Sequence, residues 1–115
     1  MHVLAVTIYP FITQAGTLAR VTAAAAKALA VPDHLMSVGY DAQQQLCGHL
    51  TVIRREEGQE NGMATARNLV DRLPELLDDD LQGVLRHVRV LWNETHAGIG
   101  ILGIAVRTYE LSVTY

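Results

Sequence analysis

Two adjacent arginines, Arg54 and Arg55, end a short β-branched run and offer anion-binding chemistry. A guanidinium group presents a planar fork of N–H donors, which suits a carboxylate held by two hydrogen bonds. Adjacent residues on a strand point to opposite faces, so we expect at most one of the two arginines to enter a given pocket. In the alternative interpretation, the arginines are solvated and pair with Glu56 or Glu57.

Other residue pairs could provide a nucleophile or acid–base groups. Cys47 and His49 stand two residues apart, so on a strand their side chains share one face. A thiol beside an imidazole can act as a nucleophile, and an inert pair is the alternative. Glu94 and His96 follow a predicted strand, and we expect them in a loop, where acid–base groups often lie. The alternative for both is a turn with solvated side chains.

The aromatic residues and one acidic run have both chemical and structural interpretations. Tyr9 and Tyr40 end predicted strands, where a phenol could donate a hydrogen bond to a developing enolate or lie in a subunit interface. Trp92, the only tryptophan, could form the wall of a binding pocket, or pack in the core or an interface. We interpret the run from Asp78 to Asp80 as a solvated corner or a helix start, because three adjacent carboxylates point in different directions.

Hydrophobic patterning predicts the elements that must position these residues. Apolar, β-branched runs predict strands at 3–8, 35–40, 49–53 and 87–92, with one or two terminal strands within 104–113. Helix formers with apolar residues at helical spacing predict a helix over 15–30, with Thr13 as its cap and Val31-Pro32 as its end. A second helix should follow Asn61. We expect Pro74 to break it near Leu73 or to start a second short turn.

These elements form a repeated unit. His2-Val3-Leu4 corresponds to His49-Leu50-Thr51 at an offset of about 47 residues. We therefore predict a single α+β domain of two β-α-β repeats, about 2–40 and 49–93, with a C-terminal extension over 98–115 that adds one or more strands. The strands would form a four-stranded mixed sheet, parallel within each unit, with two helices on one face. The other face is the expected oligomer surface.

Composition excludes several classes of function. A chain of 115 residues with a net charge of −3 holds one domain and lacks the basic face that nucleic-acid binding needs. One cysteine makes neither an internal disulfide nor a thiolate metal site, so we expect no metal and a reducing, cytoplasmic location. No signal peptide or membrane-length apolar run is evident. The surplus of small aliphatic residues favours a homo-oligomer, and one lysine beside eight arginines suggests a GC-rich bacterial genome.

Several strings resemble the tautomerase superfamily, which includes 4-oxalocrotonate tautomerase, malonate semialdehyde decarboxylase, cis-3-chloroacrylic acid dehalogenase and macrophage migration inhibitory factor. Ala30-Val31-Pro32 is similar to the end of the family's first helix, and Leu50-Thr51-Val52-Ile53 with Arg54-Arg55 to its third strand. The run from Val88 to Glu94, followed by Gly98-Ile99-Gly100, is similar to its last core strand and turn. The resemblance covers nearly the whole chain as topology and only short strings as sequence.

The resemblance implies a homo-oligomer, a trimer or hexamer, with active sites at subunit boundaries, no cofactor, and small carboxylate or carbonyl substrates. It implies that Arg55 binds the substrate anion. Members of the family use an N-terminal proline as base or acid, but this chain has His2 there, and we expect Met1 to be retained. The imidazole of His2 could replace the proline amine as general base, with His49 as its counterpart in the second repeat. Alternatively, both histidines are rim residues.

Three functional hypotheses follow. The first is a cofactor-independent isomerase or lyase of tautomerase type, with His2, Arg55 and Glu94 as catalytic residues. Its substrate-binding residues would be Arg54, His49, Trp92, His96 and Tyr40. The second is a non-catalytic, oligomeric binding or structural protein with the same fold. The third is a ferredoxin-like small-molecule-binding module, because the order β-α-β-β-α-β describes that fold too, and strand order separates the two. All three have a small molecule or another copy as partner, and none involves nucleic acid or membrane.

Overall fold

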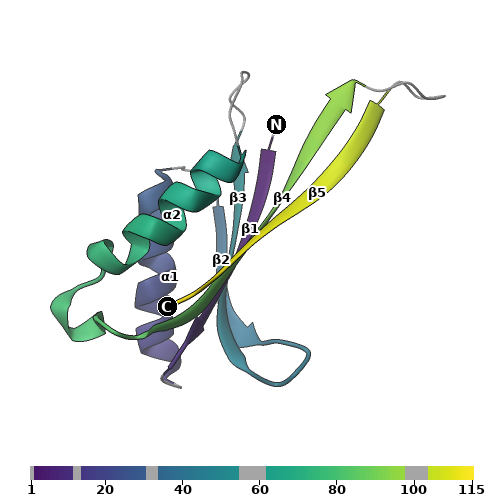
Figure 1. The fold of residues 1–115 in the computed structure, drawn as a ribbon. Coiled ribbons are helices and arrows are strands. Elements are labelled where there is room, and N and C mark those ends of the chain that lie inside the picture. Colours follow the sequence, from purple (N-terminus) through teal and green to yellow (C-terminus); the bar gives the residue numbers. More distant parts are fainter. Residues whose placement is uncertain (1, 12–13, 31–33, 55–61, 98–103) are drawn as a thin grey trace.

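The computed structural model describes residues 2–11, 14–30, 34–54, 62–97 and 104–115; at 2, 54, 94–97 and 104–107 only the backbone is described. Five strands and two long helices make up these residues (Figure 1). The strands are β1 (His2–Pro10), β2 (His34–Tyr40), β3 (Leu46–Arg54), β4 (Leu85–Ala97) and β5 (Ile104–Thr114). The helices are α1 (Ala15–Leu29) and α2 (Gly62–Leu76), and a 3₁₀ turn, η1, covers Asp79–Leu81. The α+β class and the extra C-terminal strand are confirmed.

The sheet has the order β2-β3-β1-β4-β5, and every neighbouring pair of strands is antiparallel. The mixed sheet with parallel pairing inside each β-α-β unit is therefore wrong. β3 lies between the two strands of the first unit, and β1 lies between the two strands of the second. This split β-α-β arrangement is that of ferredoxin-like domains. The resemblance to the tautomerase superfamily gains no support from the strand pairing.

Both helices cover the same face of the sheet (Figure 1). Strand β1 explains why, because its residues alternate between the two faces. Leu4, Val6 and Ile8 are fully buried beneath the helices, whereas Val3, Ala5, Thr7 and Tyr9 are only half-buried on the other face. The core lies between the helices and one face of the sheet, and the described residues leave the opposite face uncovered.

The β4–β5 hairpin extends beyond the rest of the sheet. β1 pairs with β4 as far as the Leu4–Trp92 pair, whereas β4 and β5 continue to pair with each other to Ala97 and Ile104. Glu94 and His96 lie within this two-stranded arm, opposite Arg107 and Ala105. The expectation that they lie in a loop after the strand is therefore wrong. The strand continues because β5 supplies backbone partners to its polar end.

Helix α2 contains Pro74 and continues through it to Leu76, so neither expected effect of this proline is found. A proline has no N–H, and it leaves the carbonyl four residues earlier without its helical partner. That carbonyl belongs to Val70, and it accepts a hydrogen bond of 2.6 Å from the Tyr115 hydroxyl. Burial, and then the charge of Asp71, raise the pKa of Tyr115 to about 12. Tyr115 therefore replaces the helical hydrogen bond that Pro74 removes.

The turn after α2 is held to α1 by a surface ion pair. The Arg20 guanidinium donates hydrogen bonds to Asp80 at 2.7 Å and to Asp78 at 3.0 Å. The Arg20 hydrogen bond lowers the pKa of Asp80 below its ordinary value. The acidic run lies at an exposed corner where η1 begins, so it fits both alternatives of the prediction. The described residues contain no cluster of metal-ligating side chains.

Replacement of Tyr115 by Phe should destabilise the protein by about 1–3 kcal/mol, because the Val70 carbonyl loses its partner. The same replacement should cost less in a Pro74→Ala background, where the alanine restores a backbone N–H that can donate to Val70. Urea unfolding of the four proteins in this double-mutant cycle measures the coupling. Equal costs of Tyr115→Phe in both backgrounds would contradict the account of Pro74.

Candidate functional site

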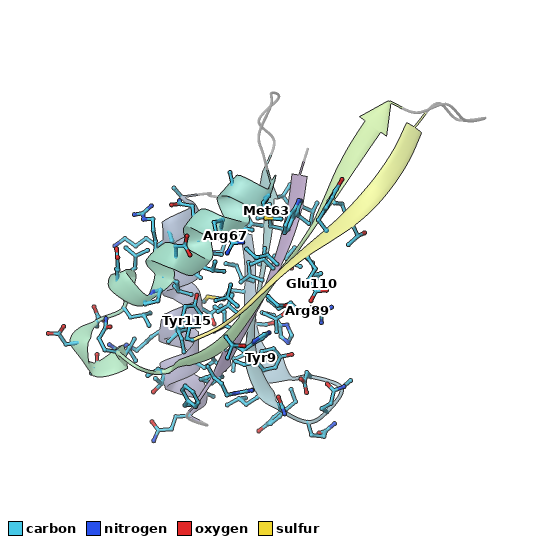
Figure 2. All side chains as sticks on the ribbon, in the orientation of Figure 1. Tyr9, Met63, Arg67, Arg89, Glu110 and Tyr115 are labelled. Carbon is cyan, nitrogen blue, oxygen red and sulfur yellow. The ribbon has the colours of Figure 1, made fainter. Side chains whose placement is uncertain are left out.

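The uncovered face of the sheet, called the open face below, brings together ionisable side chains from three neighbouring strands, β3, β1 and β4, and from β5 beyond them. Strand register defines its members. They are Val3, Ala5, Thr7 and Tyr9 of β1, Leu35, Ser37 and Gly39 of β2, Cys47, His49, Thr51 and Ile53 of β3, His87, Arg89, Leu91 and Asn93 of β4, and Thr108, Glu110, Ser112 and Thr114 of β5. Figure 2 shows Tyr9, Arg89 and Glu110 on the side of the sheet away from the helices.

The register arranges polar residues of the open face in rows across the strands. Thr7 pairs with His49 on one side and Arg89 on the other. In the neighbouring row, Tyr9 pairs with His87, and their rings lie 6.0 Å apart. Directly opposed residues on one face of a sheet are close enough for their side chains to interact. The rows therefore form a polar area at the end of the open face nearest the β2–β3 turn.

Asp41 anchors this area. Its Oδ1 accepts the backbone N–H groups of Gln43 and Gln45, each at 2.9 Å, and its Oδ2 accepts the Tyr9 hydroxyl at 3.0 Å. The hydrogen bond from Gln45 is the largest of several that lower the pKa of Asp41. The same carboxylate therefore closes the turn between β2 and β3 and fixes the phenol of a third strand.

The Cys47 and His49 side chains share the open face, as the spacing predicted. The thiol sulfur lies 3.1 Å from His49 Nε2, and Cys47 itself is fully buried. Burial, and then the charge of Asp41, raise the pKa of the Cys47 thiol. A raised pKa keeps the thiol protonated at neutral pH, which disfavours the thiolate that a cysteine nucleophile needs.

Tyr9 is also held in its protonated form. Burial, and then the hydrogen bond to Asp41, raise the pKa of the Tyr9 phenol. The Arg86 guanidinium carbon lies 5.5 Å from the Tyr9 ring centroid, in a cation–π contact. At neutral pH the area around Asp41 therefore contains a protonated phenol, whose O–H is donated to Asp41, and a buried protonated thiol in contact with an imidazole.

Arg89 and Glu110 form the ion pair of the open face. The Arg89 Nε lies 2.9 Å from Glu110 Oε1, and both side chains are about half exposed. An exposed pair of this kind is worth little to stability. It neutralises the arginine, so the open face has no strong preference for an anion at this point.

Few of the predicted site residues can be placed. Arg55 lies outside the described residues, and the side chains of His2, Arg54, Glu94 and His96 lie outside them too. The backbone register pairs His2 with Arg54 and His49 with Thr7. His2 and His49 are therefore five positions apart along the strands, about 17 Å. They are too far apart to share one small pocket.

Trp92 and Tyr40 do not contribute to the open face. Trp92 packs in the core, which is one of the alternatives that the sequence left open, with its ring stacked on Tyr109 at 5.7 Å. A Cβ at Gly62 would overlap the indole, so a glycine allows α2 to begin against it. Tyr40 is 67% exposed at the end of β2, and its register partner is Leu46.

Sequence reasoning missed Asp41, Thr7, His87, Arg89 and Glu110. The spacing of His87 and Arg89 by two residues is the same signal that linked Cys47 to His49, and it could have placed both on one face. The pairing of β4 beside β1, and not the spacing, brings them to Tyr9 and Thr7.

Comparisons with known proteins identify no relative. No family model matches the chain, and neither the curated proteins nor the solved structures include a significant match. Neither described helix is long and apolar enough to span a membrane.

Stability should fall as the pH drops below about 4, because Asp41 has a lower pKa in the folded state than in the unfolded chain. A group with a lowered folded pKa stabilises the protein above its unfolded pKa, and that contribution is lost on protonation. Asp41→Asn keeps one of the two acceptor oxygens and loses the charge, so it should melt below the wild type at pH 7 and closer to it at pH 2.

Thermal melts across this pH range test the role of Asp41. Tyr9→Phe should reduce the same acid-dependent difference in melting temperature, whereas Tyr40→Phe should leave the pH profile unchanged because Tyr40 is exposed. If the melting temperatures of the wild type and Asp41→Asn differ by the same amount at pH 7 and at pH 2, the stabilising role of the Asp41 charge is contradicted.

Proposed function

We propose that this protein is a homo-oligomeric, ferredoxin-like module that binds a small molecule at its open face, with a second copy covering the site. The observation that carries the proposal is the combination, on one uncovered face, of half-buried apolar residues and an organised group of proton donors and acceptors. Small-molecule sites are mostly apolar with a few placed polar groups, and this face supplies both.

Apolar residues on the open face support the contact with a second copy. Val3, Ala5, Ile53 and Leu91 are only half-buried in a single chain. At the neighbouring edge of the sheet, β2 exposes Leu35 to 74% and contains no lysine, arginine, aspartate, glutamate or proline. Leu35 belongs to the open face by its register with Thr51, so this exposed apolar side chain adds to the surface that a second copy would cover.

Polar residues on the open face support the small-molecule site. Tyr9, Cys47 and His49 are held by hydrogen bonds within the area around Asp41, so their positions are set before any ligand arrives. Preorganised donors and acceptors bind a polar ligand without an additional ordering cost. A neutral carbonyl compound fits this area better than an anion, because the Asp41 carboxylate is close and Arg89 is already paired with Glu110.

A second candidate function is cofactor-independent proton transfer on an enolisable carbonyl compound. The specific observation that favours it is the Cys47–His49 contact of 3.1 Å beside the Tyr9 phenol. In this scheme the other ring nitrogen of His49, Nδ1, would accept a proton from the carbon next to the carbonyl group. The Tyr9 hydroxyl would exchange its hydrogen bond to Asp41 for one to the enolate oxygen. His2, Arg55 and Glu94 remain part of this proposal only through the family resemblance.

The open face should make the protein an oligomer in solution. Ala5→Arg places a charge at the centre of this face, and light scattering coupled to size exclusion should show a monomer with an unchanged circular dichroism spectrum. Ala23→Arg makes the same change on the exposed side of α1 and should leave the oligomer intact. A monomeric wild type at micromolar concentration would refute the covering copy.

A binding screen tests the proposed small-molecule site on the open face, independently of any catalysis. In a thermal-shift screen of small neutral carbonyl compounds, stabilising compounds should lose their effect in His49→Gln and Ala5→Arg and keep it in Ala23→Arg. Compounds that stabilise the wild type and all three variants equally would show that the binding site lies outside the open face.

Deuterium incorporation tests the second candidate with the compounds that bind. In deuterated water, nuclear magnetic resonance should show exchange of the protons next to the carbonyl group, at least tenfold faster with the wild type than with His49→Gln. Binding without accelerated exchange would rule out proton transfer and retain the module.

A further inference from the structure

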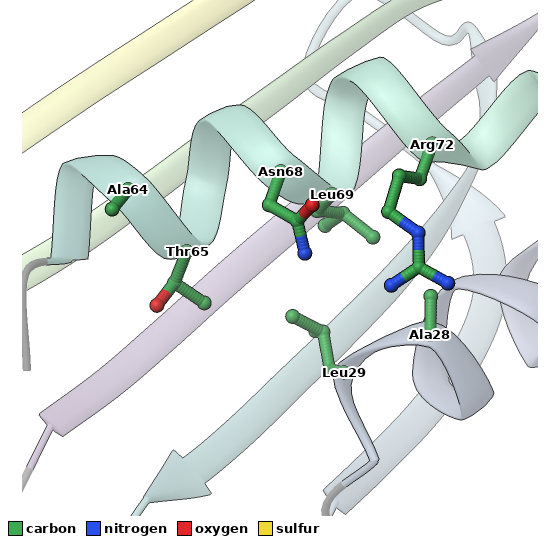
Figure 3. Close-up of a pocket in the computed structure, with 7 residues that line it drawn as sticks. All are labelled: Ala28, Leu29, Ala64, Thr65, Asn68, Leu69 and Arg72. Atoms are coloured by element: carbon green, nitrogen blue, oxygen red, sulfur yellow. The ribbon is translucent and has the colours of Figure 1, made fainter.

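We infer that the groove between α1 and α2 is a binding site for a small organic anion, on the opposite side of the molecule from the open face. Two adjoining depressions form this groove, with volumes of about 280 and 410 Å³, and Ala28 and Arg72 line both. Figure 3 shows Asn68 and Arg72 of α2 projecting toward Ala28 and Leu29 of α1. This inference does not depend on the function proposed for the open face.

Small residues on α1 create the groove. Ala24 and Ala28 stand one helical turn apart and face α2, where larger residues would fill the space between the helices. Leu29 and Leu69 are buried beneath the groove and give it an apolar floor. A short hydrocarbon body would fit against this surface.

Charge indicates which kind of molecule the groove would take. Lys27 and Arg72 line the same depression, and no aspartate or glutamate is among the described residues that line either one. Both cations lie in a protein whose net charge is −3, so they form a local positive site on an acidic chain. Two cations that line one depression raise the positive potential there, which favours an anion.

The donors in the groove suit a carboxylate or a phosphate group. Arg72 can donate two parallel hydrogen bonds to either group, and Lys27 adds a point charge. The Asn68 side-chain amide lies one helical turn before Arg72 on α2 and can donate to the same anion. The ligand class is therefore a carboxylate or a phosphate monoester on a short apolar body.

Isothermal titration calorimetry with four probes tests the site on the full chain: hexanoate, hexyl phosphate, hexanol and inorganic phosphate. At least one of the two organic anions should bind at millimolar concentration or better, and the tighter of them identifies the headgroup. Hexanol, which lacks the charge, and inorganic phosphate, which lacks the apolar body, should each bind at least tenfold more weakly. Absence of binding by both organic anions, or equal binding of hexanol, would overturn the inference.

Variants locate the site. Arg72→Gln and Lys27→Gln should each weaken binding of the tighter anion by about tenfold, because each removes a charged donor. Arg67→Gln removes an exposed arginine of the same helix that lines neither depression, and should have no effect. Ala28→Leu fills both depressions without changing charge and should also abolish binding. If Arg72→Gln weakens binding of the anion no more than Arg67→Gln does, the inference is overturned. This comparison holds whether or not Ala28→Leu folds.

Discussion

The one-sided burial of the central strand β1 is the constraint on which the rest of the structure depends. Leu4, Val6 and Ile8 lie beneath two helices, and the residues between them face away from any described element. A single layer of helices can bury only one face of a sheet. The alternate face must then be polar, be covered by another molecule, or be both in different regions. Here, apolar residues and an organised polar area divide it.

Secondary structure could be read from this sequence because its signals are local. The helix predicted over 15–30 is found over Ala15–Leu29, and the β-branched runs all fall within strands. The pairing could not be read, because a β-α-β-β-α-β order is compatible with both adjacent and split units. The choice between them depends on contacts between residues far apart in the chain. Parallel pairing was therefore predicted where β3 separates the two strands of the first unit.

In the candidate site, too, contacts within one strand were predictable from sequence, and contacts between distant segments were not. The Cys47–His49 contact was predictable because two residues on one strand share a face at this spacing. The contribution of Asp41 was not, since a residue in a turn reaches Tyr9 only after β3 lies beside β1. The replacement for the hydrogen bond lost at Pro74 was likewise not predictable from local sequence. The local effect of this proline is to remove a hydrogen bond within α2, and Tyr115, distant in sequence, supplies the replacement.

The central claim is that a second copy covers the open face. Solvent paramagnetic relaxation measures this directly, with a soluble gadolinium chelate and methyl resonances recorded at high and low protein concentration. The methyl groups of Ala5 and Leu91 should be shielded at high concentration and become accessible on dilution, while that of Ala23 should be accessible at both. A contrary result would be that the Ala5 and Leu91 methyl groups relax equally at both concentrations and as strongly as the Ala23 methyl group. That result would contradict a covering second copy.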